Sequence, residues 1–405
     1  MANSSLPIFD PNSYAFIMNR KAFLRTCGIL GLSIPFNGFS TLNTFKAASR
    51  PNRVIIVGAG AAGLSAGYLL KQKGIDFNII EADTQFGGRM KINTSFADFP
   101  TPLGAEWISS ENLDFSPLAE NEKVLERIKI ANYLPNDAYW VWDNHKLLRS
   151  TLDTYIDKKF INSSWFSFFK TFVVPSIENN IAFDTKITSI EYTNTEVVLK
   201  AKQHVFVADQ VILTTPLSIL KSKAIRFVPT LPKSKLNVLN KITYWDGFKA
   251  FFEFEQKFYP AFVDYTIQPK TDGQVSLYDA AWGQESKKHI LGLFAVGAPA
   301  KKYGDLTDEV FISQFLKELD KIFEGKASKY FIKHITQNWS KEPFAKGAYP
   351  SDFNTPRALA TLREPIRYKL YFAGDAYTDG TDWGHVHNAI YSARQCVEMM
   401  LKENQ

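Results

Sequence analysis

The stretch Val54-Ile55-Ile56-Val57-Gly58-Ala59-Gly60-Ala61-Ala62-Gly63 decides the fold that we expect. Its β-branched start predicts a short buried strand, which breaks into Gly-x-Gly-x-x-Gly and an apolar segment typical of a helix over about 61–73. Gly58 permits a tight turn, Gly60 removes a Cβ where a pyrophosphate would approach the backbone, and Gly63 allows close packing of helix and strand. The N-terminus of this helix would offer unpaired N–H groups and a positive dipole end to the pyrophosphate.

A second apolar run, residues 77–80, ends in Glu81, and an acidic side chain at that place can hydrogen-bond a ribose hydroxyl. A glycine motif alone indicates little, but this one follows an expected strand and opens an expected helix, as nucleotide binding requires. We therefore predict a dinucleotide-binding βαβ unit. The alternative is an ordinary βαβ unit that binds no nucleotide.

The composition is that of a globular protein, with 45% hydrophobic and 22% charged residues in a chain of 405. This length suffices for two domains that share a large core. The net charge of +6 is spread along the chain, without the basic block that would indicate a nucleic acid partner. Cys27 and Cys396 form no disulfide framework, and the close pair His385 and His387 is poor support for a metal site, so we expect no metal.

Residues 1–49 differ from the rest of the chain. A basic segment at 19–25 precedes a mildly apolar run at 27–36 and a possible cleavage site at 47–49, which is the order of a secretory leader. An Arg-Lys pair gives the segment a resemblance to a twin-arginine export signal, with Met18 as a candidate start. We expect export to the periplasm, and the alternative is a loosely packed tail on a cytoplasmic protein. The apolar run is too short and too interrupted to predict a membrane span.

Gly87-Gly88-Arg89 follows the acidic strand end and would place a planar cation beside the phosphate oxygens of the cofactor. Together with the glycine motif and Glu81, this turn resembles the flavin amine oxidase family of FAD enzymes, which includes monoamine and polyamine oxidases. The stretch Leu103-Gly104-Ala105-Glu106-Trp107-Ile108 is similar to the family's segment beside the flavin. The resemblance covers most of residues 52–400. It implies an α/β protein with a Rossmann-like FAD domain of the glutathione-reductase type and a second domain of mixed sheet and helices.

By this resemblance, the FAD-binding domain is assembled from residues 50–110, 182–240 and 346–405, and the substrate domain from residues 111–181 and 241–345. The alternating pattern after residue 181 resembles the family's small sheet, in which the backbone of one strand residue would pair with the adenine edge; that residue is Ile187.

Residues 111–180 depart from the family's pattern. They read as helical and irregular, are rich in aromatic residues, and are shorter than usual, without the Gly-rich segment that commonly ends this interval. This departure predicts that the substrate pocket differs in shape from that of the family.

Residues 247–255 alternate as a strand, which puts Lys249 and Phe251 on one side and Phe248 and Ala250 on the other. On this pattern alone, Lys249 reads as a solvated or snorkelling side chain. Its position matches the family lysine that holds a water near flavin N5, so the resemblance implies a catalytic role.

Residues 338–349 are similar to the family's stretch in which a Trp approaches the flavin and a Gly-x-Tyr enters the active site, which implies those roles for Trp339 and Tyr349. Where the family attaches its flavin covalently, a Cys precedes this Tyr. Here the residue is Ala348, which cannot form the thioether, so we expect non-covalent FAD. The second ring of the family's amine cage corresponds to His385, which disfavours a simple arylalkylamine substrate.

The closing motif supplies the other end of the cofactor site. The resemblance implies that Asp375 accepts hydrogen bonds from the ribityl chain, and that the last helix, starting near Gly384, favours the negative charge that builds on the reduced flavin. Our candidate catalytic residues are Lys249, Tyr349, Trp339 and His385. Our candidate cofactor-binding residues are Gly58, Gly60, Ala62, Gly63, Glu81, Gly88, Arg89, Gly104, Ala105, Glu106, Trp107, Ile187, Gly374, Asp375 and Val386.

The implied activity is FAD-dependent oxidation of an amine to an imine, which water hydrolyses, with O2 reduced to hydrogen peroxide. One alternative is another flavin oxidation in the same superfold, such as L-amino acid oxidation or desaturation of an apolar substrate. A second is an FAD-binding interaction protein without turnover. The expected partners are a small-molecule amine and O2, and the sequence indicates no particular oligomeric state.

Overall fold

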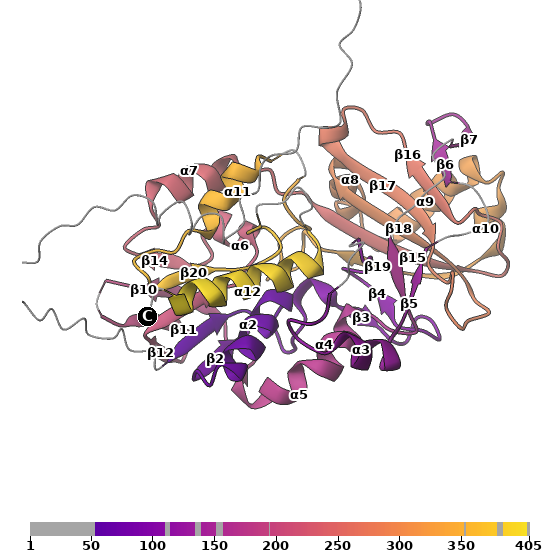
Figure 1. Cartoon of the computed structure of the whole chain (residues 1–405). Coiled ribbons are helices and arrows are strands. Elements are labelled where there is room, and N and C mark those ends of the chain that lie inside the picture. The colour runs from indigo at the N-terminus through magenta and orange to yellow at the C-terminus, as the bar shows by residue number, and fades with distance from the viewer. Residues whose placement is uncertain are drawn as a thin grey trace, which may run out of the picture. The chain divides into compact units, whose positions relative to one another are not determined.

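The structure is a computed structural model (Figure 1), which describes residues 53–109, 114–133, 139–150, 157–193, 195–351, 354–378 and 384–402. The leader that we predict at residues 1–49 lies outside this range, so export stays a prediction. Among the helices of the described part, none is both long enough and apolar enough to cross a membrane.

The glycine motif lies in a five-stranded sheet of order β20-β13-β1-β2-β9, in which every pairing is parallel. The strands are β1 (Val54–Val57), β2 (Phe77–Ile80), β9 (Ile181–Ala182), β13 (Gln210–Leu213) and β20 (Leu370–Phe372). Because parallel strands end at the same edge, the turns after β1, β2 and β20 meet there. The predicted strands at 54–57 and 77–80 are confirmed.

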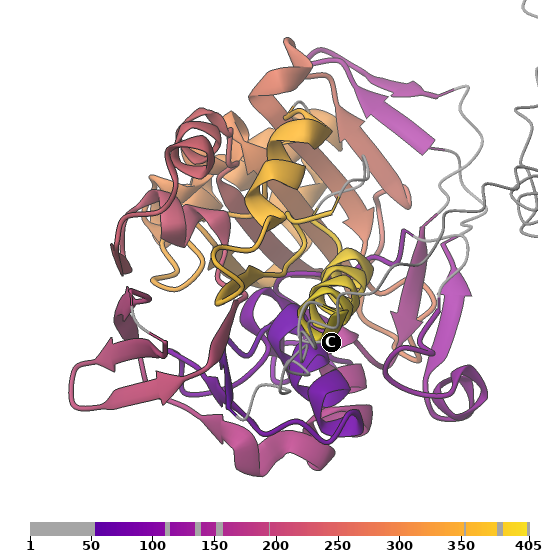
Figure 2. The same ribbon diagram turned by 60° about the vertical axis from the view of Figure 1, so that its left-hand side comes forward.

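Helix α2 (Ala61–Gln72) confirms the helix predicted at about 61–73, and it lies against the last helix, α12 (Val386–Lys402). Figure 2, viewed almost along α12, shows the yellow helix beside the indigo α2. Both helices share a buried cluster with the short helices α4 (Trp165–Phe172) and α5 (Val174–Ile177). On its other side, α2 packs close to the turn after β1, because Gly63 has no Cβ; a Cβ there would lie 1.9 Å from the Gly58 carbonyl oxygen.

The opposite face of the parallel sheet packs on a four-stranded sheet of order β12-β11-β10-β14 and on three helices. The strands are β10 (Ile187–Glu191), β11 (Val197–Ala201), β12 (Val205–Ala208) and β14 (Arg226–Val228). The helices are α6 (Leu217–Lys221), α7 (Lys233–Lys241) and α11 (Pro356–Arg363). This small sheet carries Ile187 at the start of β10, as the sequence pattern predicts.

A seven-stranded sheet of order β19-β15-β18-β17-β16-β6-β7 forms the second large layer. Its strands are β6 (Tyr139–Trp142), β7 (Leu147–Arg149), β15 (Gly247–Phe254), β16 (Phe262–Tyr265), β17 (Gly273–Asp279), β18 (His289–Gly297) and β19 (Phe331–Asn338). One face packs on α8 (Ala298–Gly304), α9 (Asp308–Ile322) and α10 (Lys326–Tyr330), where Phe248 and Phe252 contact Phe311. The predicted alternation in β15 is therefore confirmed, and the other face is left for the site.

Residues 111–180 contain more strand than the sequence pattern predicts. β6 and β7 extend the seven-stranded sheet, and β5 (Lys129–Asn132) pairs with β8 (Lys158–Ile161). The motif Tyr139-Trp140-Val141-Trp142 has no polar alternation, so its period could not reveal β6.

Shorter elements complete the described part: β3 (Ile92–Asn93), β4 (Thr101–Pro102) and α3 (Asn121–Arg127), with 3-10 turns at Gly88–Met90, Glu178–Asn180 and Lys270–Asp272. The domain boundaries at 110, 181, 240 and 345 stay a prediction.

Replacing Gly63 with Ala should destabilise the protein, because the new methyl group would overlap the Gly58 carbonyl and push α2 away from β1. We expect the free energy of unfolding to fall by about 1–3 kcal/mol, measured by urea denaturation. Gly60→Ala is the matched control, since no atom lies within 4 Å of a Cβ built there. Equal stability of the two variants in the FAD-free state would contradict this packing.

Lys235 should make stability depend on pH in the alkaline range. Its Nζ donates to the carbonyls of Thr361 and Leu362 at 2.9 and 2.8 Å, and burial lowers its pKa to about 8, against the opposing charge of Glu364. An unfolded lysine has a pKa of about 10.4, so between these two pKa values the unfolded state binds more protons and the free energy of unfolding rises with pH. In Lys235→Met, the free energy of unfolding should rise less with pH, because the contribution of Lys235 is absent. Urea denaturation measures the free energy of unfolding of both proteins at each pH. The same pH dependence in both would show that burial does not lower the pKa of Lys235.

Candidate active site

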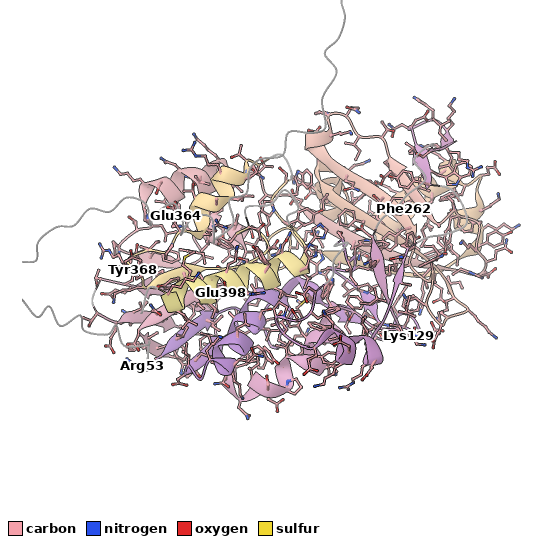
Figure 3. The ribbon with its side chains drawn as sticks, viewed as in Figure 1. Arg53, Lys129, Phe262, Glu364, Tyr368 and Glu398 are labelled. Carbon is pink, nitrogen blue, oxygen red and sulfur yellow. The ribbon has the colours of Figure 1, made fainter. Side chains whose placement is uncertain are left out.

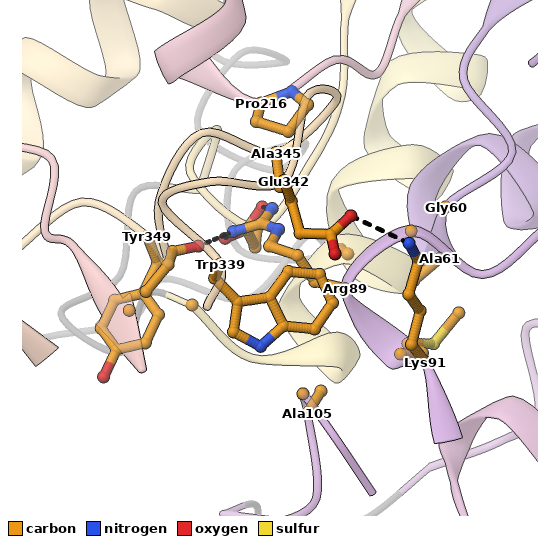
Figure 4. Close-up of a pocket in the computed structure, with 18 of the residues that line it drawn as sticks. Gly60, Ala61, Arg89, Lys91, Ala105, Pro216, Trp339, Glu342, Ala345 and Tyr349 are labelled. Carbon is orange, nitrogen blue, oxygen red and sulfur yellow. Dashed lines mark hydrogen bonds and ion pairs between the residues drawn. The ribbon is translucent and has the colours of Figure 1, made fainter. Parts of the chain in front are cut away.

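A cavity of about 660 Å³ extends from the carboxyl edge of the parallel sheet to the uncovered face of the seven-stranded sheet (Figure 4). Its volume is within the range of small-molecule and cofactor sites. Of the nineteen candidate residues named from the sequence, eighteen line it. The exception, Gly63, lies behind Gly58 and acts by allowing α2 to pack close to β1.

The nucleotide end of the cavity is built mainly from backbone. Gly58 has a φ of +111°, which an L side chain rarely adopts, so this turn requires glycine. Gly60 faces open space, and α2 begins there without a side-chain cap or an acidic residue in its first turn. An uncapped helix N-terminus with room in front of it suits a phosphate group.

Glu81 is held against the glycine turn. Its Oε2 accepts the Ala59 N–H at 2.5 Å, and its Oε1 accepts the Asp83 N–H at 2.8 Å. Burial raises the pKa of Glu81, while these backbone N–H groups oppose the rise. The carboxylate therefore lines the cavity in a fixed orientation, with lone pairs left for a ribose hydroxyl.

Arg89 and Asp375 form a bidentate pair, with Nη2 2.5 Å from Oδ1 and Nη1 3.1 Å from Oδ2. Arg89 also donates to the Ala348 carbonyl and to the Tyr244 hydroxyl. Burial would lower the pKa of Arg89, but Asp375 and the Tyr244 hydroxyl raise it above its ordinary value. From the sequence we assigned these two residues to different parts of the cofactor, and their mutual pairing is a feature that the sequence does not predict.

A second ion pair bridges the cavity and was missed by sequence reasoning. Lys91 Nζ lies 3.0 Å from Glu342 Oε2 and 3.2 Å from Asp83 Oδ2. In Figure 4 this pair lies beside Gly60 and Ala61. It joins the Gly-Gly-Arg turn to the loop after β19, and no local pattern links residues so far apart in the sequence.

The other end of the cavity rests on the seven-stranded sheet. In the register of that sheet, Lys249 pairs with Phe294 and Phe294 with Ser276, so the three side chains form one row on the cavity face. The next row includes Tyr278 and Gly292. A Cβ on Gly292 would lie 2.4 Å from the Tyr278 ring, so this glycine lets the ring lie across its strand.

Lys249 is 3% exposed, so the interpretation of this residue as solvated is wrong. Its Nζ donates to Glu106 Oε2 at 2.7 Å and to the carbonyls of Pro102 and Gly104 at 2.9 and 3.0 Å. These contacts use all three ammonium donors. Glu106 also accepts a hydrogen bond from the Tyr278 hydroxyl at 2.5 Å. Lys249, Glu106 and Tyr278 therefore form a buried polar wall of the cavity.

Aromatic rings form much of the remaining wall: Trp107, Phe262, Phe294, Trp339 and Tyr349. Trp339 is fixed by a hydrogen bond from its Nε1 to the Leu103 carbonyl at 2.9 Å and by close contact with Gly104. Tyr349 packs edge-on against Trp245 and against Gly384, where a Cβ would lie 2.7 Å from its ring.

The candidate residue His385 lies just before α12 and lines the cavity with Val386. Its ring stacks on His387 with centroids 5.2 Å apart. Within the described residues, no group of three or more His, Cys, Asp or Glu side chains is placed to hold a metal ion.

Comparisons with known proteins agree with this geometry. Residues 175–401 match the family described as flavin containing amine oxidoreductase. The chain belongs to this family. Residues 56–119 match an NAD(P)-binding Rossmann-like domain, which contains the glycine motif. The family resemblance and the α/β fold that we predict from the sequence are confirmed, and FAD is the cofactor.

Relatives of this family member include polyamine oxidase 1 of Zea mays, which is 22% identical over 464 residues covering 88% of this chain and 91% of the relative. Lysine-specific histone demethylase 1B of Mus musculus is 24% identical over 204 residues, which cover 49% of this chain but only 25% of that protein. Putrescine oxidase bound to putrescine has the same fold, with a TM-score of 0.71 at 15% identity over 87% of this chain and 99% of that one. Cyclohexylamine oxidase from Brevibacterium oxydans also has a TM-score of 0.71, at 16% identity and the same coverage.

Gly60→Ala should weaken FAD binding without unfolding the protein. The added methyl group meets no protein atom but would occupy the space in front of α2. A steric conflict of about 1–3 kcal/mol corresponds to a rise in the FAD dissociation constant of roughly 5- to 150-fold. Titration of FAD-free protein by flavin fluorescence measures this change. An unchanged dissociation constant would place the pyrophosphate elsewhere.

Proposed function

We propose that the chain oxidises an amine to an imine and passes the electrons to O2, with its FAD held non-covalently. One observation carries this proposal. The part of the cavity that lies on the seven-stranded sheet, which we call the chamber, has walls formed by the rings of Phe262, Phe294 and Tyr349. It opens beside Lys249, which is buried and paired with Glu106. Oxidoreductase activity with a flavin follows from the family, which is described as flavin containing amine oxidoreductase. The choice of an amine donor is supported by relatives named polyamine oxidase and by a neighbour of the same fold named putrescine oxidase.

The residues at the nucleotide end fit FAD. The α2 N-terminus at Gly60 would receive the pyrophosphate, Glu81 a ribose, and the Arg89–Asp375 pair the ribityl region. When bound there, FAD supplies the two-electron oxidation of the amine and the reduction of O2 to hydrogen peroxide.

Non-covalent attachment is supported by the chemistry of the cavity wall. Ala348 stands before Tyr349 and presents only a methyl group. Among the described residues, the free cysteine is Cys396, which is buried in the cluster between α12 and α2 and does not line the cavity. No described side chain near the flavin region can therefore form a thioether.

The chamber wall indicates which part of a substrate it holds. The rings of Tyr349, Phe262 and Phe294 present apolar surface that would exclude water and pack on the carbon skeleton of an amine. Besides the polar wall of Lys249, Glu106 and Tyr278, the lining includes the Ser276 hydroxyl and the Gln274 amide, which are hydrogen-bonded to each other. His385 stands where the family has a second ring of the amine cage, so we propose an amine other than a simple arylalkylamine.

The decisive assay is anaerobic mixing of the FAD-loaded protein with a panel of amines. We expect one structural class of amine to bleach the flavin absorbance, and readmission of air to restore the colour with one equivalent of hydrogen peroxide. The panel should include diamines, polyamines, cyclic amines and L-amino acids. Bleaching by L-amino acids alone would favour that alternative activity, and bleaching by none would favour a binding protein without turnover.

Lys249→Met should slow turnover or flavin reoxidation by roughly 10- to 100-fold while FAD stays bound, because the variant removes a proton-carrying group from the chamber wall. Rapid-mixing absorbance measurements separate reduction from reoxidation. Lys288→Met is the matched control, since Lys288 pairs with Glu253 and does not line the cavity. Wild-type kinetics in Lys249→Met would remove this residue from the mechanism.

A further inference from the structure

We propose that Lys159 is a positioning residue for Lys249, which holds the Glu106 carboxylate from the opposite side and so determines the place and the charge of Lys249. Lys159 lies on β8, in the interval where sequence reasoning identified no site residue. The arrangement stands on geometry alone, whereas its effect on catalysis rests on the proposed function, in which Lys249 takes part in turnover.

The two lysines contact different oxygens of one carboxylate. Lys249 Nζ lies 2.7 Å from Glu106 Oε2, and Lys159 Nζ lies 3.4 Å from Glu106 Oε1. Glu106 and Lys249 line the cavity, whereas Lys159 is outside its lining. Lys159 therefore acts from behind the cavity lining, and its ion-pair partner in that lining is Glu106.

Lys159 is anchored firmly behind the cavity. Its side chain is 2% exposed, and its Nζ donates to the Ala280 carbonyl at 2.9 Å, with the Asp279 carbonyl at 3.5 Å. The rings of Trp107, Tyr133 and Tyr278 surround the ammonium group, with centroids 5.4, 5.6 and 5.7 Å away. An ammonium held by ring faces and carbonyls keeps its charge at a fixed point.

The cluster carries more positive than negative charge. Lys249 faces the Glu106 carboxylate, which also accepts a hydrogen bond from the Tyr278 hydroxyl. Lys159 lies on the other side of this carboxylate. Despite burial, Lys249, Lys159 and the Tyr278 hydroxyl lower the pKa of Glu106. Burial, together with the like charge of Lys159, lowers the pKa of Lys249, although Glu106 opposes this. One carboxylate shared by two cations thus stays ionised, and the cation on the cavity wall gives up its proton more readily.

Lys159→Met tests this role. Methionine keeps the length and apolar stem of lysine but removes the charge, which leaves Lys249 and Glu106 as a balanced pair. Lys249 should then titrate at higher pH, because its like-charged neighbour is gone. Lys129→Met is the matched control, since Lys129 lies on the paired strand β5 and its side chain is 75% exposed (Figure 3).

The readout is the titration of the Lys249 side chain by NMR in FAD-loaded protein labelled with 13C at the lysine Cε, with the resonance assigned by its loss in Lys249→Met. We expect a shift to higher pH in Lys159→Met, none in Lys129→Met, and a matching shift in the pH profile of amine turnover. Titration of Lys249 at the wild-type pH in Lys159→Met would overturn the proposal. A shifted titration without turnover of any amine would leave it standing and would defeat the proposed function instead.

If Lys159→Met does not fold, the wild-type protein supplies the test. The Lys249 side chain should titrate below the range of the exposed lysines, because burial and the like charge of Lys159 both lower its pKa. Titration of the Lys249 resonance within the range of the exposed lysines would overturn the proposal.

Discussion

The buried carboxylate of Glu106 is the constraint on which the substrate half of the site depends. It is 7% exposed, and a carboxylate so removed from water must be paired and hydrogen-bonded. Its partners come from three places in the chain: Lys249 on β15, Tyr278 on β17 and Lys159 on β8. Meeting these partners fixes the 101–107 segment over the face of the seven-stranded sheet, and that contact closes the cavity wall beside the expected flavin.

The two ends of the cavity are built by different means. The nucleotide end is shaped by backbone, with a glycine turn, an open helix N-terminus and a carboxylate tied to the turn by N–H groups. The chamber end is shaped by side chains that stand in register across the sheet, with Phe294 between Lys249 and Ser276. A backbone-made site tolerates sequence change around it, whereas a side-chain-made chamber changes with each substitution. This difference explains why the residues of the nucleotide end indicate the cofactor more directly than the residues of the chamber indicate the substrate.

The same difference decides what could be predicted from the sequence. Gly58, Gly60 and Glu81 act through local spacing, and the structure places all three on one cavity. Local patterns could not reveal that Arg89 pairs with Asp375, or that Lys159 and Tyr278 meet on Glu106, because these contacts join distant segments. Lys249 reads as an ordinary strand lysine until its partners are known. The strand β6 was missed because its continuous apolar run has no polar alternation.

The most direct test of this account is the pH dependence of stability in Glu106→Gln. The variant leaves Lys249 and Lys159 buried without a counterion, so we predict a free energy of unfolding lower by about 3–5 kcal/mol at neutral pH. In the folded variant, Lys249 should then titrate below the unfolded value of about 10.4, so the free energy of unfolding should rise with pH and its difference from wild type should narrow. Equal stability at neutral pH, with parallel pH curves, would contradict the claim that this carboxylate holds the site together.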